Sequence, residues 1–277
     1  YGHVGSNRPS EPSNASIYSR SHNKITMSKI ILITGASSGL GKATAEKFAA
    51  EGWNLILTAR RKEKLAVVVN DIEKKYGVKT LSLIFDVQDK KAVFEHLEKL
   101  PKEWQAINVL LNNAGLALGR DPFEEANLED WETMIDTNLK GLLYASKAVL
   151  PFIIAQKGHI INIGSTAGKE VYKDGNVYCA TKHAVDAISK AQRIDLLHHQ
   201  VKVTAIHPGA VETDFSIVRF KGDTTKADAV YAGYTPLKAE DIADTIWYVA
   251  NTPEHVCIND LVITCTAQGN STTIFKG

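Results

Sequence analysis

A tyrosine and a lysine stand four residues apart in the segment YCATK, residues 178–182. The stretch from about Gly175 to His199 has a helical pattern, and positions i and i+4 lie on one helix face. We therefore expect the Lys182 ammonium near the Tyr178 hydroxyl. A phenol with its ordinary pKa of about 10 is a poor base, but a neighbouring cation favours the phenolate. The pair could exchange a proton with a substrate oxygen, although this spacing is common on any helix.

Ser165 gives this pair a possible partner. It directly follows an apolar run, His159–Ile163, that has the pattern of a strand. The carboxyl ends of parallel strands converge on the ligand crevice of a doubly wound sheet. Its hydroxyl could therefore hold the substrate oxygen that Tyr178 protonates or deprotonates. The run Val109–Leu111 likewise ends in small and polar residues, NNAG (112–115), where a cofactor would have to pass.

The strands and helices that must position these residues are predicted by a regular alternation along the sequence. From Lys29 onward, short apolar runs alternate with segments whose apolar residues are three and four apart. The alternation predicts parallel strands with right-handed crossovers, and the near-continuous apolar character predicts a sheet buried on both faces. We expect a single α/β domain of Rossmann type, a doubly wound seven-stranded parallel sheet with helices on both faces. The predicted strands are Ile30–Ile33, Leu55–Leu57, Leu81–Phe85, Val109–Leu111, His159–Ile163, Val201–Ile206 and Leu261–Ile263.

Two stretches depart from this alternation of strand and helix patterns. Residues 1–26 are rich in Ser, Asn, Pro and Arg, and we expect a disordered leader or a vector-derived remnant there, with a transit peptide as the alternative. The folded domain is expected to span residues 27–277. The stretch from Thr213 to Pro236 interrupts the pattern after a late strand, which is where a substrate lid would lie.

The octapeptide TGASSGLG, residues 34–41, lies between the first predicted strand and the first predicted helix. Glycines at 35, 39 and 41 allow a tight turn and a close approach to a pyrophosphate, and the helix N-terminus supplies N–H groups and partial positive charge. Such a turn alone is weak evidence. Its place after the first strand of an α/β chain predicts a dinucleotide site.

The second predicted strand indicates which dinucleotide is bound. It runs into Arg60 and Arg61 and carries no carboxylate that could accept a bond from a ribose 2′-hydroxyl. Two guanidiniums suit a 2′-phosphate, and because cations at a helix N-terminus oppose its dipole, a bound anion explains them better than solvation does. We expect NADP rather than NAD. Asp86, before Val87, could accept from the adenine amino group or cap the next helix.

These motifs, in this order and at these separations, resemble the short-chain dehydrogenase/reductase family from about Lys29 to the C-terminus. The family pattern T-G-x-x-x-G-x-G matches residues 34–41, N-N-A-G matches 112–115, and P-G matches 208–209. The family's catalytic residues match Asn138, Ser165, Tyr178 and Lys182. The cofactor contacts predicted from the motifs and the resemblance are Gly35, Ser37, Ser38, Gly39, Leu40, Gly41, Arg60, Arg61, Asp86, Val87, Asn113, Ala114, Gly115, Tyr178, Lys182, Pro208, Gly209, Val211 and Thr213.

The resemblance implies a mechanism in which hydride passes directly between the nicotinamide and a substrate carbon. Tyr178 would exchange the proton, and Ser165 would polarise the substrate oxygen. Lys182 would hold the nicotinamide ribose and lower the pKa of the tyrosine. Asn138 would anchor a water that links Lys182 to solvent, although a helix-kink role explains an asparagine there as well.

A narrower resemblance concerns the substrate. Residues 112–119, 129–138, 161–168 and 218–222, with the terminal IFKG, are similar to the NADP-dependent 3-hydroxy acid dehydrogenases. This implies L-serine, L-allo-threonine, 3-hydroxyisobutyrate or the 3-hydroxypropionate/malonic semialdehyde pair as substrate. An anionic substrate needs a cation, and our hypothesis is that Arg219 binds its carboxylate, with Lys221 or Lys169 as lesser candidates. A solvated run of charges is the alternative.

Composition limits the other possibilities. The chain has 277 residues and a net charge of +1, which provides no basic field for nucleic acid or membrane. Three cysteines without metal-ligand spacing fit a reducing, cytoplasmic compartment and no metal site. The resemblance implies a homotetramer. Rival functions are a carbonyl reductase for other ketones or sulfonated aldehydes, and, more remotely, a non-catalytic dinucleotide sensor.

Overall fold

The computed structural model describes residue 2 and residues 28–277, so the predicted leader lies, Gly2 apart, outside the described residues. The described part is built on one parallel sheet in the order β3-β2-β1-β4-β5-β6-β9. The order reverses at β1 and β4, where Ile33 of β1 pairs with Leu57 on one side and Leu111 on the other. The strands are β1 (Ile30–Thr34), β2 (Asn54–Ala59), β3 (Thr80–Ile84), β4 (Ile107–Asn112), β5 (His159–Ile163), β6 (Lys202–Pro208) and β9 (Asp260–Ile263).

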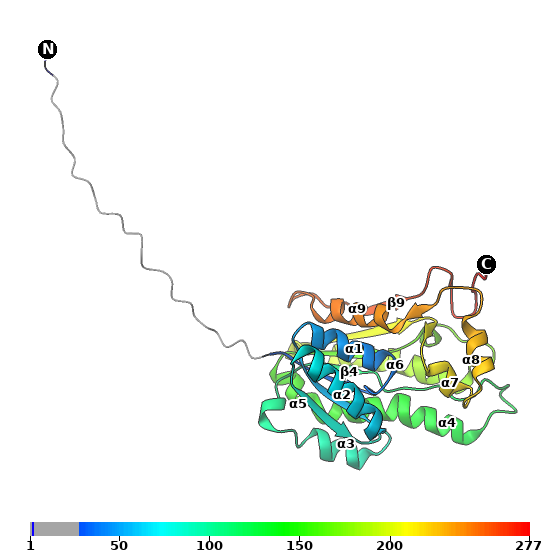
Figure 1. The fold of residues 1–277 in the computed structure, drawn as a ribbon, viewed down its shortest axis with the longest axis horizontal. Coiled ribbons are helices and arrows are strands. Elements are labelled where there is room, and N and C mark those ends of the chain that lie inside the picture. Colours follow the sequence, from blue (N-terminus) through cyan, green and yellow to red (C-terminus); the bar gives the residue numbers. More distant parts are fainter. Residues whose placement is uncertain (1, 3–27) are drawn as a thin grey trace.

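Helices cover the two faces of the sheet in separate layers (Figure 1). On one face, Phe48, Leu65 and Ile246 belong to a single buried cluster and come from three different helices. These helices are α1 (Gly39–Ala50), α2 (Lys62–Tyr76) and α9 (Ala239–Ala250). On the other face, the buried side chains of Val93 and Val149 pack with strand residues. That layer contains α3 (Lys90–Leu97), α5 (Leu142–Ala155) and α6 (Asn176–Asp195), and α4 (Leu128–Ile135) continues into α5 through a π-helical stretch, Asp136–Gly141.

All seven predicted strands are confirmed to within three residues at either end. The prediction that the whole sheet is buried on both faces is wrong for its two edges. Ser82 and Ile84 of β3 are exposed, as are Asp260 and Val262 of β9, whereas β1 and β5 are buried throughout. The reason is positional, because an edge strand has a neighbour on one side alone and the covering helices end there. Alternation along β3 therefore replaces the continuous burial of the central strands.

The irregular stretch from Thr213 to Pro236 forms an excursion between β6 and α9. It contains two short helices, α7 (Phe215–Arg219) and α8 (Thr224–Tyr231), and it is closed at its base by a parallel pair, β7 (Val211–Glu212) and β8 (Leu237–Lys238). The excursion stands beyond the carboxyl end of β6, as the predicted lid should. Within the described residues, no helix combines the length and apolar character needed to cross a membrane.

Candidate active site

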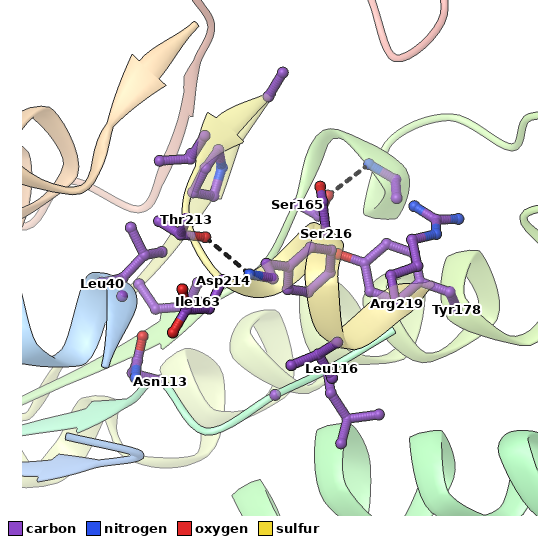
Figure 2. A pocket seen from close by; sticks show the side chains of 18 of the residues that line it. Leu40, Asn113, Leu116, Ile163, Ser165, Tyr178, Thr213, Asp214, Ser216 and Arg219 are labelled. Atoms are coloured by element: carbon purple, nitrogen blue, oxygen red, sulfur yellow. Dashed lines mark hydrogen bonds between the residues drawn. The ribbon is translucent and has the colours of Figure 1, made fainter. Parts of the chain in front are cut away.

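A cavity of about 670 Å³ opens at the carboxyl ends of the strands. Its walls come from the glycine-rich turn before α1, from the residues after β2, β3, β4, β5 and β6, and from the excursion that carries α7 and α8. In Figure 2, Ser165, Tyr178 and Arg219 lie together on one side of this space and Thr213 lies on the other. The topology therefore collects residues that are far apart in the chain at one edge of the sheet.

Tyr178 lies on α6 and is almost fully buried, with 8% of its surface exposed. It belongs to a small buried cluster that also contains Leu116, Met134 and Ala167. The Arg219 guanidinium carbon lies 5.4 Å from the ring centroid, and the Phe215 ring centroid lies 5.8 Å away. The phenol is thus held in an apolar niche, with a cation over its ring.

The predicted effect of Lys182 on this phenol is not found. Burial raises the pKa of Tyr178 above its usual value, the nearby Tyr172 raises it further, and the Ser165 hydrogen bond and the Arg219 charge oppose that rise without cancelling it. The Lys182 ammonium instead donates to the backbone oxygen of Ile163 at 2.9 Å. Burial also lowers the pKa of Lys182 to about 8. Both shifts have one physical cause: desolvation disfavours the charged form of each group.

Ser165 is fixed by the turn that it begins. It precedes a 3₁₀ turn, Thr166–Gly168, and its Oγ accepts from the Ala167 N–H at 3.1 Å. Its backbone lies beside His207, whose Nδ1 is 3.4 Å from Ser165 N and 3.2 Å from Ser165 O. The hydroxyl consequently has a defined position at the end of β5, within reach of Tyr178.

Asn138 lies behind the cavity wall, in the π-helical stretch, and is 2% exposed. Its Oδ1 accepts from Leu116 N at 2.8 Å, and its Nδ2 donates to Leu116 O at 2.8 Å and to Thr181 Oγ1 at 3.1 Å. A Cβ at Gly115 would lie 3.2 Å from Asn138 Oδ1 and 3.5 Å from Lys182 Nζ. Asn138 therefore fixes the segment after β4 and lies close to Lys182, which the water-anchoring role would need, and its position in the π-helical stretch is what a helix-kink role would need.

The glycine-rich turn fits a dinucleotide phosphate. Gly35 and Gly39 have positive φ angles, +70° and +52°, and a Cβ at Gly41 would overlap the backbone oxygen of Gly35. Within the described part of the chain, the Ser38 side chain at the α1 N-cap makes no hydrogen bond to the helix, so the first N–H groups of α1 face the cavity end without a side-chain cap. Free N–H groups at a helix N-terminus form an anion site.

The two arginines after β2 have different partners. The Arg61 Nη2 donates to Ser37 Oγ at 3.1 Å and to Ser38 Oγ at 2.9 Å. Arg60 forms an ion pair with Asp86 at 3.1 Å. Arg61 and the two serines thus make a cluster of donors beside the glycine-rich turn, whereas the charge of Arg60 is already balanced.

Asp86 does not cap the helix that follows it. The helix-cap alternative is wrong, because α3 is capped by Asp89, which accepts from Ala92 N. Asp86 accepts from Gln88 N at 3.0 Å and lines the cavity with Val87. Of the predicted cofactor contacts, Gly41 alone is not in the wall, and its role is the close packing of α1 against the turn.

The three candidate cations for a substrate carboxylate differ in whether they line the cavity. Arg219 is in the wall, where its Nη2 donates to Tyr172 Oη at 3.1 Å and its Nε to Gly119 O at 3.4 Å. Lys221 is paired with Asp130 at 2.7 Å, and Lys169 is paired with two aspartates. Neither lysine lines the cavity, so the geometry favours Arg219 over both lesser candidates, and Arg219 is half-buried rather than part of a solvated charge run.

Several wall residues carry no signal in the sequence. The excursion was expected to cover the site, but no pattern indicated which of its side chains would turn inward. The aromatic ring of Tyr172 comes from an irregular loop, and the last residues reach the wall through a short isolated bridge between Gln268 and Ile274. The wall residues that were not predicted include Arg120, Thr166, Tyr172, Phe215, Ser216, Tyr231, Gln268, Ile274 and Lys276.

The fold and this cavity define a doubly wound, dinucleotide-binding type of α/β protein with a buried tyrosine, serine and lysine at its strand ends. A family model described as short chain dehydrogenase matches residues 29–223. The chain belongs to the short-chain dehydrogenase family and is an oxidoreductase. The alternative of a non-catalytic sensor is therefore set aside.

The chain is similar to several characterised relatives. It is 48% identical over 232 residues to an NADP-dependent 3-hydroxy acid dehydrogenase, YdfG, of Salmonella typhi, covering 83% of this chain and 92% of that protein. It is 44% identical over 244 residues to sulfoacetaldehyde reductase 2 of Chromohalobacter salexigens, covering 87% and 96%. Among solved structures, the closed form of a serine dehydrogenase complexed with NADP+ superposes with a TM-score of 0.83 at 45% identity, covering 87% of this chain and 97% of that one.

Proposed function

We propose that this protein is an NADP-dependent oxidoreductase that interconverts a short 3-hydroxy acid and its 3-oxo form. The substrates that we propose are L-serine, L-allo-threonine, 3-hydroxyisobutyrate and the 3-hydroxypropionate/malonic semialdehyde pair. Relatives named as 3-hydroxy acid dehydrogenase and serine dehydrogenase support this class. The observation that carries the proposal is one cavity that joins Ser165, Tyr178 and Lys182 with the guanidinium of Arg219.

NADP, when bound, supplies the hydride acceptor or donor. Arg61, Ser37 and Ser38 would hold its 2′-phosphate, because they present a guanidinium and two hydroxyls at one point. The uncapped N-terminus of α1 would hold the pyrophosphate. Lys182 would hold the nicotinamide ribose through the ammonium that now donates to Ile163 O.

The remaining residues act on the substrate. The Ser165 hydroxyl would bond the substrate oxygen, and Tyr178 would take its proton during oxidation and return it during reduction. Arg219 uses Nε and Nη2 for protein contacts, and a guanidinium has five N–H donors, so donors remain for a substrate carboxylate. Asn138 would order a water near Lys182 for exchange of the proton with solvent.

A second candidate function is reduction of a sulfonated aldehyde. The relative named sulfoacetaldehyde reductase favours it. A sulfonate and a carboxylate are both oxyanions that a guanidinium can bind, so the same Arg219 would serve either substrate.

Assembly and location complete the proposal. We place the protein in the cytoplasm as a homotetramer, formed through the faces of α4, α5 and α6. Leu143 on α5 and Ile194 on α6 are 41% and 74% exposed, and contact with a partner subunit would bury them.

The test is the rate of NADPH formation with L-serine, 3-hydroxyisobutyrate and a two-carbon hydroxysulfonate. Tyr178→Phe should lower kcat for the best substrate by about 10²–10⁴-fold, with the dissociation constant of NADP unchanged. Tyr231→Phe is the matched control, because it removes another phenol hydroxyl from the wall, one that is bonded to Ser216 and Val211. The proposal fails if Tyr178→Phe turns over at the wild-type rate, and a preference for the sulfonate would select the second candidate.

A further inference from the structure

A second polar cluster lies behind Ser165, on the far side of the cavity wall. It contains Lys169, Asp186, His207 and Asp260, which come from a loop, α6, β6 and β9. Among the described residues, these four side chains contact one another but none of them lines the cavity. The mechanism above does not use them.

The contacts within the cluster are close. Lys169 Nζ pairs with Asp186 Oδ1 at 2.9 Å and also with Asp260 Oδ2. His207 Nε2 lies 3.2 Å from Asp260 Oδ1 and 3.6 Å from Asp186 Oδ1. Two carboxylates and an imidazole could also ligate a divalent metal, but here the Lys169 ammonium supplies the positive charge between the carboxylates.

His207 transmits this arrangement to Ser165. Its side chain is fully buried, and a Cβ at Gly164 would overlap its ring, so the imidazole packs directly on the backbone before Ser165. Nε2 faces the two carboxylates, and Nδ1 lies 3.4 Å from Ser165 N and 3.2 Å from Ser165 O, so the ring contacts both polar atoms of the Ser165 backbone. Burial lowers the pKa of His207, and the Lys169 charge lowers it further, against the opposing effects of Asp260, the Ser165 backbone contact and Asp186.

Lys169 connects the same segment to the helix of Tyr178. The segment from Ser165 to Lys169 is held at its start by His207 and at its end by the Lys169–Asp186 ion pair. Asp186 follows Tyr178 by eight residues along α6, so the two lie on one helix face. The ion pair thus joins the loop that carries the serine to the helix that carries the tyrosine.

We propose that Lys169, Asp186, His207 and Asp260 form a positioning cluster that sets the Ser165 hydroxyl relative to the Tyr178 phenol. The inference rests on the proposed function. The four residues touch no reacting atom, and they act through the backbone of residues 165–169. When the cluster is broken, that segment moves, and the Ser165 hydroxyl, which lowers the pKa of Tyr178, favours the phenolate less.

The experiment compares Lys169→Met with Lys190→Met. Both lysines pair with Asp186, but Lys190 reaches the other carboxylate oxygen, at 2.7 Å, from the same helix and is exposed. The Lys190–Asp186 pair lies within α6 and connects that helix to no other element. Lys190→Met is therefore the matched control. Lys169→Met should lower kcat on the order of 10²-fold, with the NADP dissociation constant unchanged, and Lys190→Met should match the wild type.

The pH profile separates positioning from a merely structural effect. Alcohol oxidation needs the Tyr178 phenolate, so kcat rises with pH, and its midpoint should move up by about one unit in Lys169→Met, which is the worth of a hydrogen bond to a charged group. The other groups that face the phenol, Tyr172, Cys179 and Arg219, are the same in both variants. Lys169→Arg should restore the wild-type midpoint.

The outcomes are distinct. An unchanged midpoint and kcat in Lys169→Met, or an equal shift in Lys190→Met, overturns the inference and leaves the proposed function intact. Full activity of Tyr178→Phe would overturn the proposed function itself. If Lys169→Met does not fold, Asp260→Asn, which keeps the size of the side chain and removes one charge of the cluster, should show the same upward midpoint.

Discussion

At the scale of single residues, we expect the two arginines beside the glycine-rich turn to contribute unequally to phosphate binding. Arg61 is bonded to two neutral hydroxyls and keeps its full charge, whereas the charge of Arg60 is offset by Asp86. A phosphate beside both guanidiniums gains more from the one whose charge is uncompensated. Cofactor preference should therefore depend chiefly on Arg61.

Arg61→Gln tests this expectation. Loss of a charge-assisted contact, about 1.5–3 kcal/mol, should raise the KM for NADP by about 10- to 100-fold and leave the KM for NAD unchanged. Arg60→Gln should have a smaller effect, and Lys62→Gln, an equal charge change at an exposed neighbour, should have none. The measurement is steady-state kinetics with each cofactor, and an equal rise for NAD in Arg61→Gln would contradict the idea.

The sequence predicts that Ser165, Tyr178 and Lys182 come together, and all three line the cavity, but it does not predict their electrostatic balance. The i, i+4 spacing of Tyr178 and Lys182 predicts that they share one helix face, and both line the cavity. It also predicted that the ammonium would dominate the phenol, whereas burial does. The pKa of a buried group depends on its desolvation and on the charges near it. Arg219 lies near Tyr178 in space but forty-one positions later in the chain, so local spacing does not predict its effect.

At the scale of elements, the strands were predictable and the excursion was predictable only in outline. Central strands such as β1 and β5 are apolar throughout because both faces are covered. The short helices α7 and α8 have little periodicity of their own, and they are held by tertiary contacts such as Tyr231 Oη with Val211 O at 2.8 Å. Such contacts join residues twenty positions apart, which a local pattern does not show.

The excursion nevertheless carries the residue that should select an anionic substrate. Arg219→Met should raise the KM for L-serine by about 10- to 100-fold, the worth of a charge-assisted bond, and change the KM for an uncharged aldehyde much less. Because the Arg219 charge also lowers the pKa of Tyr178, kcat for L-serine oxidation at neutral pH should fall as well.

The ratio of the two KM values is therefore the quantity to measure. Lys221→Met is the control, since Lys221 lies two positions away and is engaged with Asp130. Equal increases in KM for the charged and the uncharged substrate would remove Arg219 from substrate recognition.

At the scale of the whole molecule, polar side chains inside the core make stability sensitive to acid. His159 on β5 is 2% exposed, and its Nε2 lies 2.7 Å from Thr204 Oγ1 on β6. Burial lowers the pKa of His159 to about 3, with a smaller contribution from Lys202. A histidine in the unfolded chain titrates near 6.5. Between that pH and about 3, His159 is therefore protonated in the unfolded chain and neutral in the folded chain.

The free energy of unfolding should therefore fall as the pH drops from about 6.5 toward 3, by up to about 1.4 kcal/mol per pH unit for this one group. The lowered pKa of His207 acts in the same direction. His159→Gln should flatten the decline, as measured by denaturant unfolding at pH 7 and pH 5. His255→Gln, at an exposed histidine, should keep the wild-type slope, and an undiminished slope in His159→Gln would count against this account.

The spacing along α6 constrains how this chain can change in length. Tyr178, Lys182 and Asp186 recur at intervals of four residues, and each added residue turns a helix by about 100°. One insertion or deletion between 178 and 186 would change the direction of the Tyr178 side chain relative to the Asp186–Lys169 ion pair. Divergent copies of this gene should therefore collect their length changes in the 213–236 excursion and keep this stretch of helix at a constant count.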